Sequence, residues 1–306
     1  MQVLVLGSAA GGGYPQWNCN CPNCDGLRAG TIRAQARTQS SIAVSANGRD
    51  WVLVNASPDI LFQLRATPAL QPAPGRRNTP IAAVMLMDAQ IDHVTGLLML
   101  REGDPLRLYC TAAVWGDLNT GLPLGKVLSH YCGLNWNELP ISSDAPEAIE
   151  VAGIDGIRFT PIPLSSKAPP YSPHRNAAEP GDNIGLLIEN TATGKRLFYA
   201  PGLGKPEPHV VHAMKQADCV LVDGSFWSDD EMIRLGLANK TALSMGHLPQ
   251  SGPDGMIALL ETLGERRKVL IHINNSNPIL NEDSDEATEL ARHGIETAYD
   301  GMEIVL

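Results

Sequence analysis

Four residues whose side chains bind metals or transfer protons follow the apolar run IAAVMLM. Asp88, Gln90, Asp92 and His93 stand at positions i, i+2, i+4 and i+5. A strand that opens into a helix is where α/β proteins place ligand sites, and adjacent Asp and His side chains can reach one ion together. Taken alone, the segment also fits a helix N-cap at Asp92 beside an ordinary polar histidine. Both interpretations stay open at this point.

Three residues near the ends of later apolar runs favour the metal interpretation. Asp223 lies in CVLVDGSF, His247 in SMGHLPQSG and His272 in KVLIHIN. Four strand ends that each carry such a residue are hard to explain by core packing, so we predict a shared site. His174, in a Pro-rich loop, could be a surface residue or touch a substrate. The histidines predicted to lie on the surface are His130, His209, His212 and His293.

A second cluster comprises Cys19, Cys21 and Cys24, spaced C-x-C-x2-C within the segment 18–25. Thiolates suit Zn²⁺, and a turn around Pro22 would bring the three together. The alternative is a trio of ordinary thiols. We predict a structural zinc in a Cys-rich loop, with a fourth ligand from a distant segment that ties this loop to the rest of the fold. The cysteines predicted to be small core residues are Cys110, Cys132 and Cys219.

Composition narrows the class of protein. The 306 residues, 43% of them hydrophobic, suit one large domain over 1–306. A formal net charge of -10 argues against nucleic-acid and anionic-membrane partners, which are held by Lys and Arg. The N-terminus lacks a basic region before its apolar run, and no stretch approaches the roughly 18 apolar residues of a membrane helix. We therefore expect a cytoplasmic protein, where cysteines are thiols or metal ligands.

The order of predicted elements indicates a layered α/β fold with mixed sheets, because strands come first and then alternate with helices. The Pro-rich segments 71–80 and 165–183 are predicted loops, and the second could cover a substrate. Predicted strands span 2–7, 40–46, 51–56, 81–88, 106–111, 157–164, 183–190, 196–202, 219–226, 268–274 and 294–306. Predicted helices span 57–70, 111–120, 208–217, 252–265 and 281–294.

Three motifs together resemble a known family over essentially the whole chain. GSAAGGGYPQWNCNCPNC, DAQIDHVTGLL and HINNSNPIL are similar to the pyrroloquinoline quinone biosynthesis protein B family, within the metallo-β-lactamase-fold superfamily. The resemblance implies an αββα sandwich of two mixed β-sheets flanked by helices. It also implies a small-molecule ligand, either a precursor derived from a Glu-Tyr peptide or the finished quinone. A homodimer is compatible with it.

The resemblance assigns residues as well. Members of the superfamily usually carry His-x-His-x-Asp-His, and Asp88 and Gln90 replace the first two histidines here. Asp92, His93 and His272 match metal-binding positions, and His247 matches a proton donor. In the zinc-binding relatives, a histidine three residues after the late active-site histidine joins the cysteines. Asn275 occupies that position, so it is the implied fourth zinc ligand.

The ligands that remain point away from a binuclear hydrolase. Two imidazoles and one carboxylate can hold Fe²⁺ and leave open positions for O2 and substrate. The expected reaction is hydroxylation of the tyrosine ring, with Asp88 or His247 relaying protons and Gln90 orienting a neighbouring ligand. Two alternatives stay open: a metal-dependent hydrolase, and a non-catalytic carrier of the finished quinone.

Overall fold

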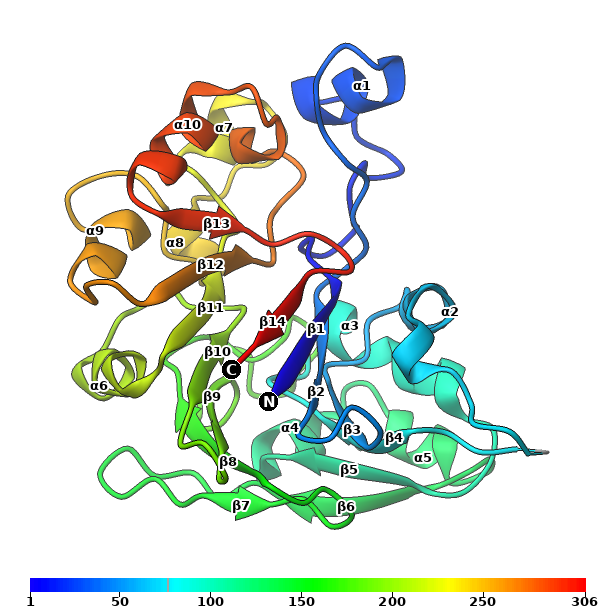
Figure 1. Ribbon diagram of the computed structural model, residues 1–306. Coiled ribbons are helices and arrows are strands. Elements are labelled where there is room, and N and C mark those ends of the chain that lie inside the picture. The colour runs from blue at the N-terminus through cyan, green and yellow to red at the C-terminus, as the bar shows by residue number, and fades with distance from the viewer. Residues whose placement is uncertain (76) are drawn as a thin grey trace.

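Two seven-stranded sheets pack face to face in the computed structural model, which describes residues 1–75 and 77–306 (Figure 1). In order across the first sheet, the strands are β14 (Glu303–Val305), β1 (Gln2–Gly7), β2 (Ser41–Ser45), β3 (Trp51–Val54), β4 (Ile81–Met85), β5 (Leu106–Cys110) and β6 (Leu134–Glu138). In order across the second, they are β13 (Ile295–Thr297), β12 (Arg267–Ile271), β11 (Cys219–Asp223), β10 (Arg196–Ala200), β9 (Ile184–Asn190), β8 (Ile157–Pro163) and β7 (Ile149–Glu150). Both sheets are mixed, as predicted.

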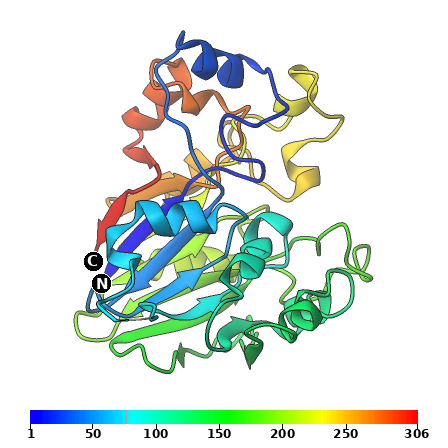
Figure 2. The same cartoon turned by 90° about the vertical axis from the view of Figure 1, so that its right-hand side faces the viewer.

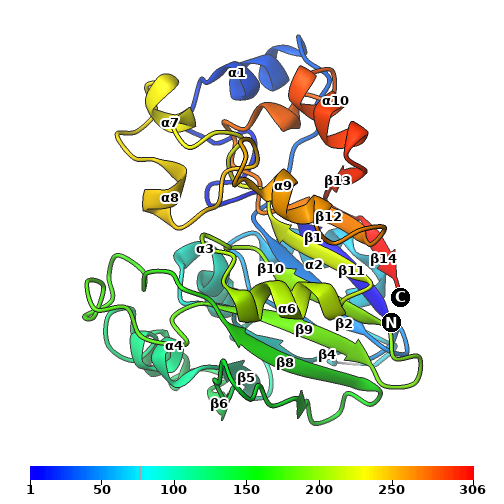
Figure 3. The same ribbon diagram turned by 90° about the vertical axis from the view of Figure 1, so that its left-hand side faces the viewer.

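Helices cover the two outer faces, and further helices lie beyond one end of the sheets (Figures 2 and 3). Those described are α1 (Pro22–Ala29), α2 (Ile60–Ala66), α3 (Ile91–Val94), α4 (Ala112–Asp117), α5 (Leu124–Leu128), α6 (Pro208–Gln216), α7 (Glu231–Arg234), α8 (Ala242–Met245), α9 (Met256–Glu261) and α10 (Asp285–Arg292). Short 3-10 helices are η1 (Pro68–Leu70), η2 (Thr95–Leu100) and η3 (Pro278–Leu280). The αββα layering implied by the resemblance is confirmed.

Alternation along β4 shows how the sequence builds three apolar layers. Ala83 and Met85 point into the core between the sheets, whereas Val84 and Leu86, the residue directly after β4, pack under the helices on the outer face. Successive side chains of a strand point to opposite faces, so a strand buried on both sides is apolar throughout. The second sheet has its own outer layer, in which α6, α9 and α10 participate.

Parallel strands at the centre of each sheet position the site. β3, β4, β5 and β6 are parallel to one another, as are β10, β11, β12 and β13. Parallel neighbours end at the same edge, where α/β proteins bind ligands. The segments that follow β4, β11 and β12 carry the residues singled out in the sequence.

The predicted C-terminal strand 294–306 is wrong as a single element. It divides into β13, beside β12 in the second sheet, and β14, antiparallel to β1 in the first. A turn at Asp300 and Gly301 separates them, and Gly301 has a φ of 89°. The two ends of the chain meet, since the Met1 ammonium donates to the Leu306 carbonyl.

Other differences concern short elements. β6 and β7 were not predicted, and the predicted helix 57–70 is shortened to α2 followed by η1. The segment 165–183 contains no helix and no strand beyond a single bridge between Asn183 and Asp88, as predicted for a loop. Residue 76 of the predicted loop 71–80 lies outside the described residues. Among the described helices, none has the length and apolarity required to cross a bilayer.

Candidate metal centre

The ends of β4 and β12 bring Asp92, His93 and His272 together from opposite sheets. Asp92 and His93 lie in the short helix α3, and His272 directly follows β12. One ligand atom from each residue lies within 4.8 Å of the others. His272 has a φ of 60°, a left-handed conformation that is uncommon for residues other than glycine and that clusters at functional sites.

Asp88 fixes the orientation of the His93 ring. The two carboxylate oxygens of Asp88 lie 2.8 and 2.9 Å from His93 Nδ1, so this nitrogen carries the proton and donates it. Nε2 of His93 therefore points the other way, 3.9 Å from Asp92 Oδ2. That oxygen also lies 3.3 Å from Nε2 of His272. Ligating histidines in metal sites are held by the same kind of carboxylate contact.

One buried atom supports a metal at this place. Nε2 of His93 is buried and has no hydrogen-bond partner among the described residues. Leaving such an atom unpaired costs about 1–3 kcal/mol, and a bound cation would supply the missing partner. Two imidazoles and one carboxylate are also the donor set of non-haem Fe²⁺ sites with open positions. The residues therefore fit a single metal ion.

Charge pairing within the group shifts its titration. Burial opposes the charged form of His93, but the carboxylates of Asp88 and Asp92 outweigh it and raise the pKa of His93 to about 9. Burial likewise opposes ionisation of Asp92, and His93 and His272 outweigh it, so the pKa of Asp92 is lowered. A metal ion that replaces the proton on His93 would supply the positive charge that balances the carboxylates of Asp88 and Asp92.

A second group adjoins His272 and consists of Asp223, Ser225 and His247. Both carboxylate oxygens of Asp223 have hydrogen-bond partners. Oδ1 of Asp223 accepts from the backbone N–H and hydroxyl of Ser225, at 2.9 and 2.6 Å. Oδ2 accepts from the backbone N–H of Leu203 at 3.0 Å and lies 2.6 Å from His247 Nδ1. Each carboxylate oxygen of Asp223 thus has two hydrogen-bond partners, and the group forms a hydrogen-bond network around His272.

Ser225 links that network to the candidate ligand His272. Its hydroxyl lies 3.0 Å from Nδ1 of both His247 and His272. Burial opposes the charged form of His247, but Asp223 outweighs it and raises the pKa of His247. Ser225 was not predicted, although its position two residues after Asp223 in a strand-end turn was an available signal.

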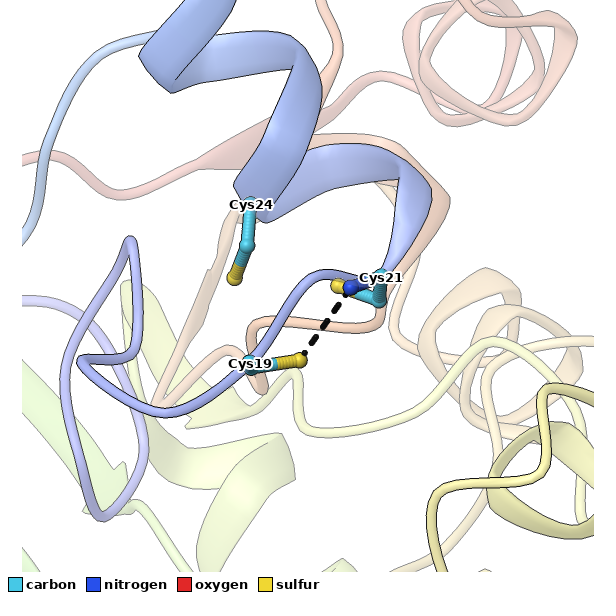
Figure 4. A group of neighbouring side chains, drawn as sticks. All are labelled: Cys19, Cys21 and Cys24. Atoms are coloured by element: carbon cyan, nitrogen blue, oxygen red, sulfur yellow. Dashed lines mark hydrogen bonds between the residues drawn. The ribbon is translucent and has the colours of Figure 1, made fainter.

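Cys19, Cys21 and Cys24 lie together in the N-terminal segment (Figure 4), and the predicted partner Asn275 contacts all three. The amide nitrogen of Asn275 lies 3.1, 3.5 and 3.4 Å from the sulfurs of Cys19, Cys21 and Cys24. Amide nitrogen and oxygen are interchangeable by a flip. Zinc bond lengths of about 2.3 Å to sulfur and 2.0–2.2 Å to oxygen set tetrahedral S···O separations near 3.5 Å. The four side chains therefore fit a tetrahedral zinc.

The Cys-rich segment is not entirely a loop, which corrects the predicted loop 18–25. Helix α1 begins at Pro22, so Cys24 projects from its first turn. Proline suits the start of a helix, and Gly30 ends this one with a φ of 67°. Burial raises the pKa of Cys21 to about 12, whereas hydrogen bonds from Cys21 and Asn275 outweigh burial and lower that of Cys19. Zinc would hold all three as thiolates.

Hydrogen bonds join the segment that carries the cluster to the residues after β12. The side-chain amide of Asn23 donates to the carbonyls of Asn275 and Asn277, at 3.1 and 2.7 Å. Since Asn275 stands three residues after His272, the two candidate metal sites share one short segment.

A cavity of about 570 Å³ opens above the candidate metal centre. It is lined by all six predicted active-site residues, Asp88, Gln90, Asp92, His93, His247 and His272. Gly11 also borders it, and a Cβ atom there would lie 3.2 Å from Asp92 Oδ2, so the glycine-rich turn allows close approach. A larger cavity of about 730 Å³ at the other end of β4 and β5 has neither His nor Cys in its described lining.

The structure also gives the surroundings of several other residues singled out in the sequence. Gln90 precedes α3, and its backbone N–H donates to Asp88 Oδ1 at 2.8 Å. His174 does not line the cavity, because its ring lies 2.8 Å from Asp182 and 3.1 Å from Ser172 instead. The remaining cysteines, Cys110, Cys132 and Cys219, are buried as predicted.

Comparisons with known proteins show the family to which this chain belongs. The Beta-lactamase superfamily domain matches residues 50–273. The coenzyme PQQ synthesis protein B of Azoarcus sp. is 62% identical over 308 residues, covering 100% of both chains. That of Cupriavidus necator is 63% identical over 305 residues, covering 99% of each. This chain belongs to the coenzyme PQQ synthesis protein B family.

Solved structures place the family within a wider fold. Zn²⁺-bound PqqB from Methylobacterium extorquens is 39% identical, covers 100% of both chains and has a TM-score of 0.89. A diphosphatase of the PhnP family shares the fold at 19% identity and a TM-score of 0.67. The metallo-β-lactamase fold implied by the sequence motifs is confirmed.

Proposed function

We propose that this protein acts in the biosynthesis of pyrroloquinoline quinone (PQQ) as an iron(II)-dependent hydroxylase. Its substrate would be a precursor derived from a glutamate and a tyrosine, and the tyrosine ring would gain one oxygen atom. One atom of O2 enters the ring and the other leaves as water, with two electrons and two protons from an external reductant. Its relatives are named coenzyme PQQ synthesis protein B, which supports a role in PQQ biosynthesis.

The reaction class is inferred from a difference in hydrogen bonding between the two groups of residues around His272. His93 Nε2 lacks a partner beside Asp92 and His272, whereas the Asp223 oxygens are fully hydrogen-bonded. A binuclear hydrolase needs two ions to generate hydroxide and stabilise the intermediate. Among the described residues Asp223 therefore offers no free oxygen to a second ion, although His247 Nε2 is open, and this favours one metal held by Asp92, His93 and His272 over the two ions of a hydrolase.

Iron(II) bound by two histidines and a carboxylate supplies the redox chemistry that O2 activation requires. The protein side chains supply orientation and proton transfer. Asp88 holds the proton on His93 Nδ1 and so directs Nε2 toward the ligand group. Asp223 holds His247 through Nδ1, which leaves His247 Nε2 to exchange a proton with a ligand in the cavity. Gln90 helps to fix Asp88.

The decisive experiment follows oxygen into the product. Protein purified without O2 is loaded with Fe²⁺ and given the glutamate–tyrosine adduct, a reductant and ¹⁸O2. We expect a product that is heavier by one ¹⁸O atom, lost in His93→Ala and in His272→Ala but retained in the exposed control His212→Ala.

Other outcomes separate the alternatives. Incorporation of oxygen from labelled water after bond cleavage would indicate a hydrolase. Recovery of an unchanged adduct from iron-loaded protein that binds PQQ would indicate a carrier. Either outcome would refute the hydroxylase proposal.

A further inference from the structure

Basic side chains from two separate segments line the cavity above the candidate metal centre. Lys167 and Arg175 belong to the connection between β8 and β9, and Lys240 immediately precedes the N-cap of α8. Figure 3 shows that connection and α8 at the same edge of the sandwich. The cavity is thus bordered by positive charge from both segments, in a chain whose formal net charge is -10.

These charges are not neutralised within the described part of the chain. Lys167, Arg175 and Lys240 form no ion pair there, whereas Lys195 and Arg267 lie 2.7 Å from acidic partners. The carboxylates lining the cavity, Asp88 and Asp92, already contact His93 and His272.

Glu207, which contacts Ser165 next to the cavity, faces Lys205 at 3.6 Å. It therefore has a basic partner of its own. Like charges gathered in a cleft repel one another and attract an anion of matching shape.

The segment that carries two of these charges is held in place. The amide of Asn183 donates to the Lys167 carbonyl at 3.2 Å, and Arg175 Nη1 donates to the carbonyl of Ala168. The Tyr171 hydroxyl donates to Ala89, next to Asp88. Because one guanidinium nitrogen is fixed in this way, Arg175 can present its other N–H groups to a ligand at a reduced entropic cost.

Carboxylate is the anion that fits the proposed function. We propose that the cavity binds a small aromatic anion through at least two carboxylate groups, with Lys167 and Arg175 contacting one side and Lys240 the other. This inference rests on the proposed function because it names the substrate class of the same cavity. The three basic residues act in binding, and the ring of the ligand would lie toward His93 and His272.

The test measures binding without turnover. The Kd of PQQ, which carries three carboxylates, is measured by equilibrium dialysis. The full-length protein retains the metals with which it was purified, and no reductant is added. The single variant Arg175→Gln, at the half-buried position, is expected to raise Kd about tenfold, since a hydrogen bond to a charged group contributes about 1.5–3 kcal/mol and 1.4 kcal/mol is tenfold. Lys167→Gln and Lys240→Gln are each expected to raise Kd by up to about fivefold, because both side chains are exposed and an exposed ion pair contributes about 0.2–1 kcal/mol. Matched controls are Lys126→Gln and Arg49→Gln, both exposed and outside the cavity.

Two further arms separate carboxylate recognition from other effects. The triple variant replaces Lys167, Arg175 and Lys240 by Gln together. The trimethyl ester of PQQ is expected to lose at least as much affinity for the wild-type protein as PQQ loses for this triple variant. A His93→Ala/His272→Ala protein is expected to keep the contribution of the three basic residues, which separates them from chelation of a metal. Thermal unfolding of each variant verifies that it is folded.

The inference is overturned if wild-type protein shows no saturable binding, if the ester binds as tightly as the acid, or if the triple variant binds like the controls. Failure of the proposed hydroxylation is a separate result. A protein that binds PQQ through these residues but incorporates no ¹⁸O would contradict the reaction and leave carboxylate recognition standing.

Discussion

Replacement of Asp88 tests how the protein prepares His93 for a metal. The side chains of His93 and Asp88 are only 3% and 7% exposed, so their contact is shielded from water. Oδ1 of Asp88 accepts from the Gln90 N–H and lies 2.8 Å from His93 Nδ1. Asp88→Asn can keep both hydrogen bonds through its amide oxygen and loses only the charge, whereas Asp88→Ala loses the orientation of the ring as well.

The expected magnitudes follow from that difference. Loss of a partner that orients a ligating histidine lowers metal affinity by about 10–100-fold. We expect Asp88→Asn at the lower end, about tenfold or 1.4 kcal/mol, and Asp88→Ala near one hundredfold. Fe²⁺ or Co²⁺ affinity is measured by competition with a chromophoric chelator under anaerobic conditions.

Asp59→Asn is a matched control, because Asp59 also accepts from a neighbouring residue, Gln39, but lies outside the cavity. If Asp88→Ala binds the metal within twofold of wild type while retaining the wild-type unfolding temperature, the orienting role assigned to Asp88 is wrong.

Three more predictions concern separate parts of the molecule. Cys21→Ser is expected to lower the unfolding temperature and abolish its response to chelators, because a structural zinc contributes folding free energy; calorimetry with and without chelator measures this, and full stability in the variant would refute it. Gly11→Ala is expected to weaken metal binding at the candidate centre without a matching loss of stability, because the added Cβ would lie 3.2 Å from Asp92 Oδ2; equal metal affinity would contradict this. The side-chain hydrogen bond to Asp182 is the leading cause that raises the pKa of His174, so the charged ring stabilises the fold fully below pH 6.5 and loses that effect as pH rises through its folded pKa. His174→Gln is therefore expected to lower the unfolding temperature more at pH 6 than at pH 9, and a pH-independent difference would argue against this ion pair.

The residues of the candidate centre could be grouped from the sequence because they follow apolar strands. Strand ends in an α/β fold gather at one edge, so Asp92, His93 and His272 could be grouped although about 180 residues separate them. The contact between Asp88 and His93 depends on the geometry of the turn before α3, which spacing alone does not determine.

Features that depend on the geometry of turns and on contacts between neighbouring strand ends were less accessible. Ser225 contacts His247 and His272 only because the turns after β11 and β12 meet. Helix α1 escaped prediction because its first residues read as a cysteine-rich turn, although Pro22 and Gly30 stand at its two ends. The C-terminal segment was read as one strand because its apolar residues continue on both sides of a turn.

The pairing of β1 with β14 has a consequence for how the chain folds during synthesis. Val3 pairs with Ile304, so about 300 residues must be added before this edge of the first sheet can form. At about 5–20 residues per second, translation takes roughly 15–60 s over that length. Throughout that interval one side of β1 presents unpaired N–H and C=O groups, the kind of edge that invites pairing with other chains. This side of β1 therefore stays open to other chains until β14 has been made, after every residue of both candidate metal sites.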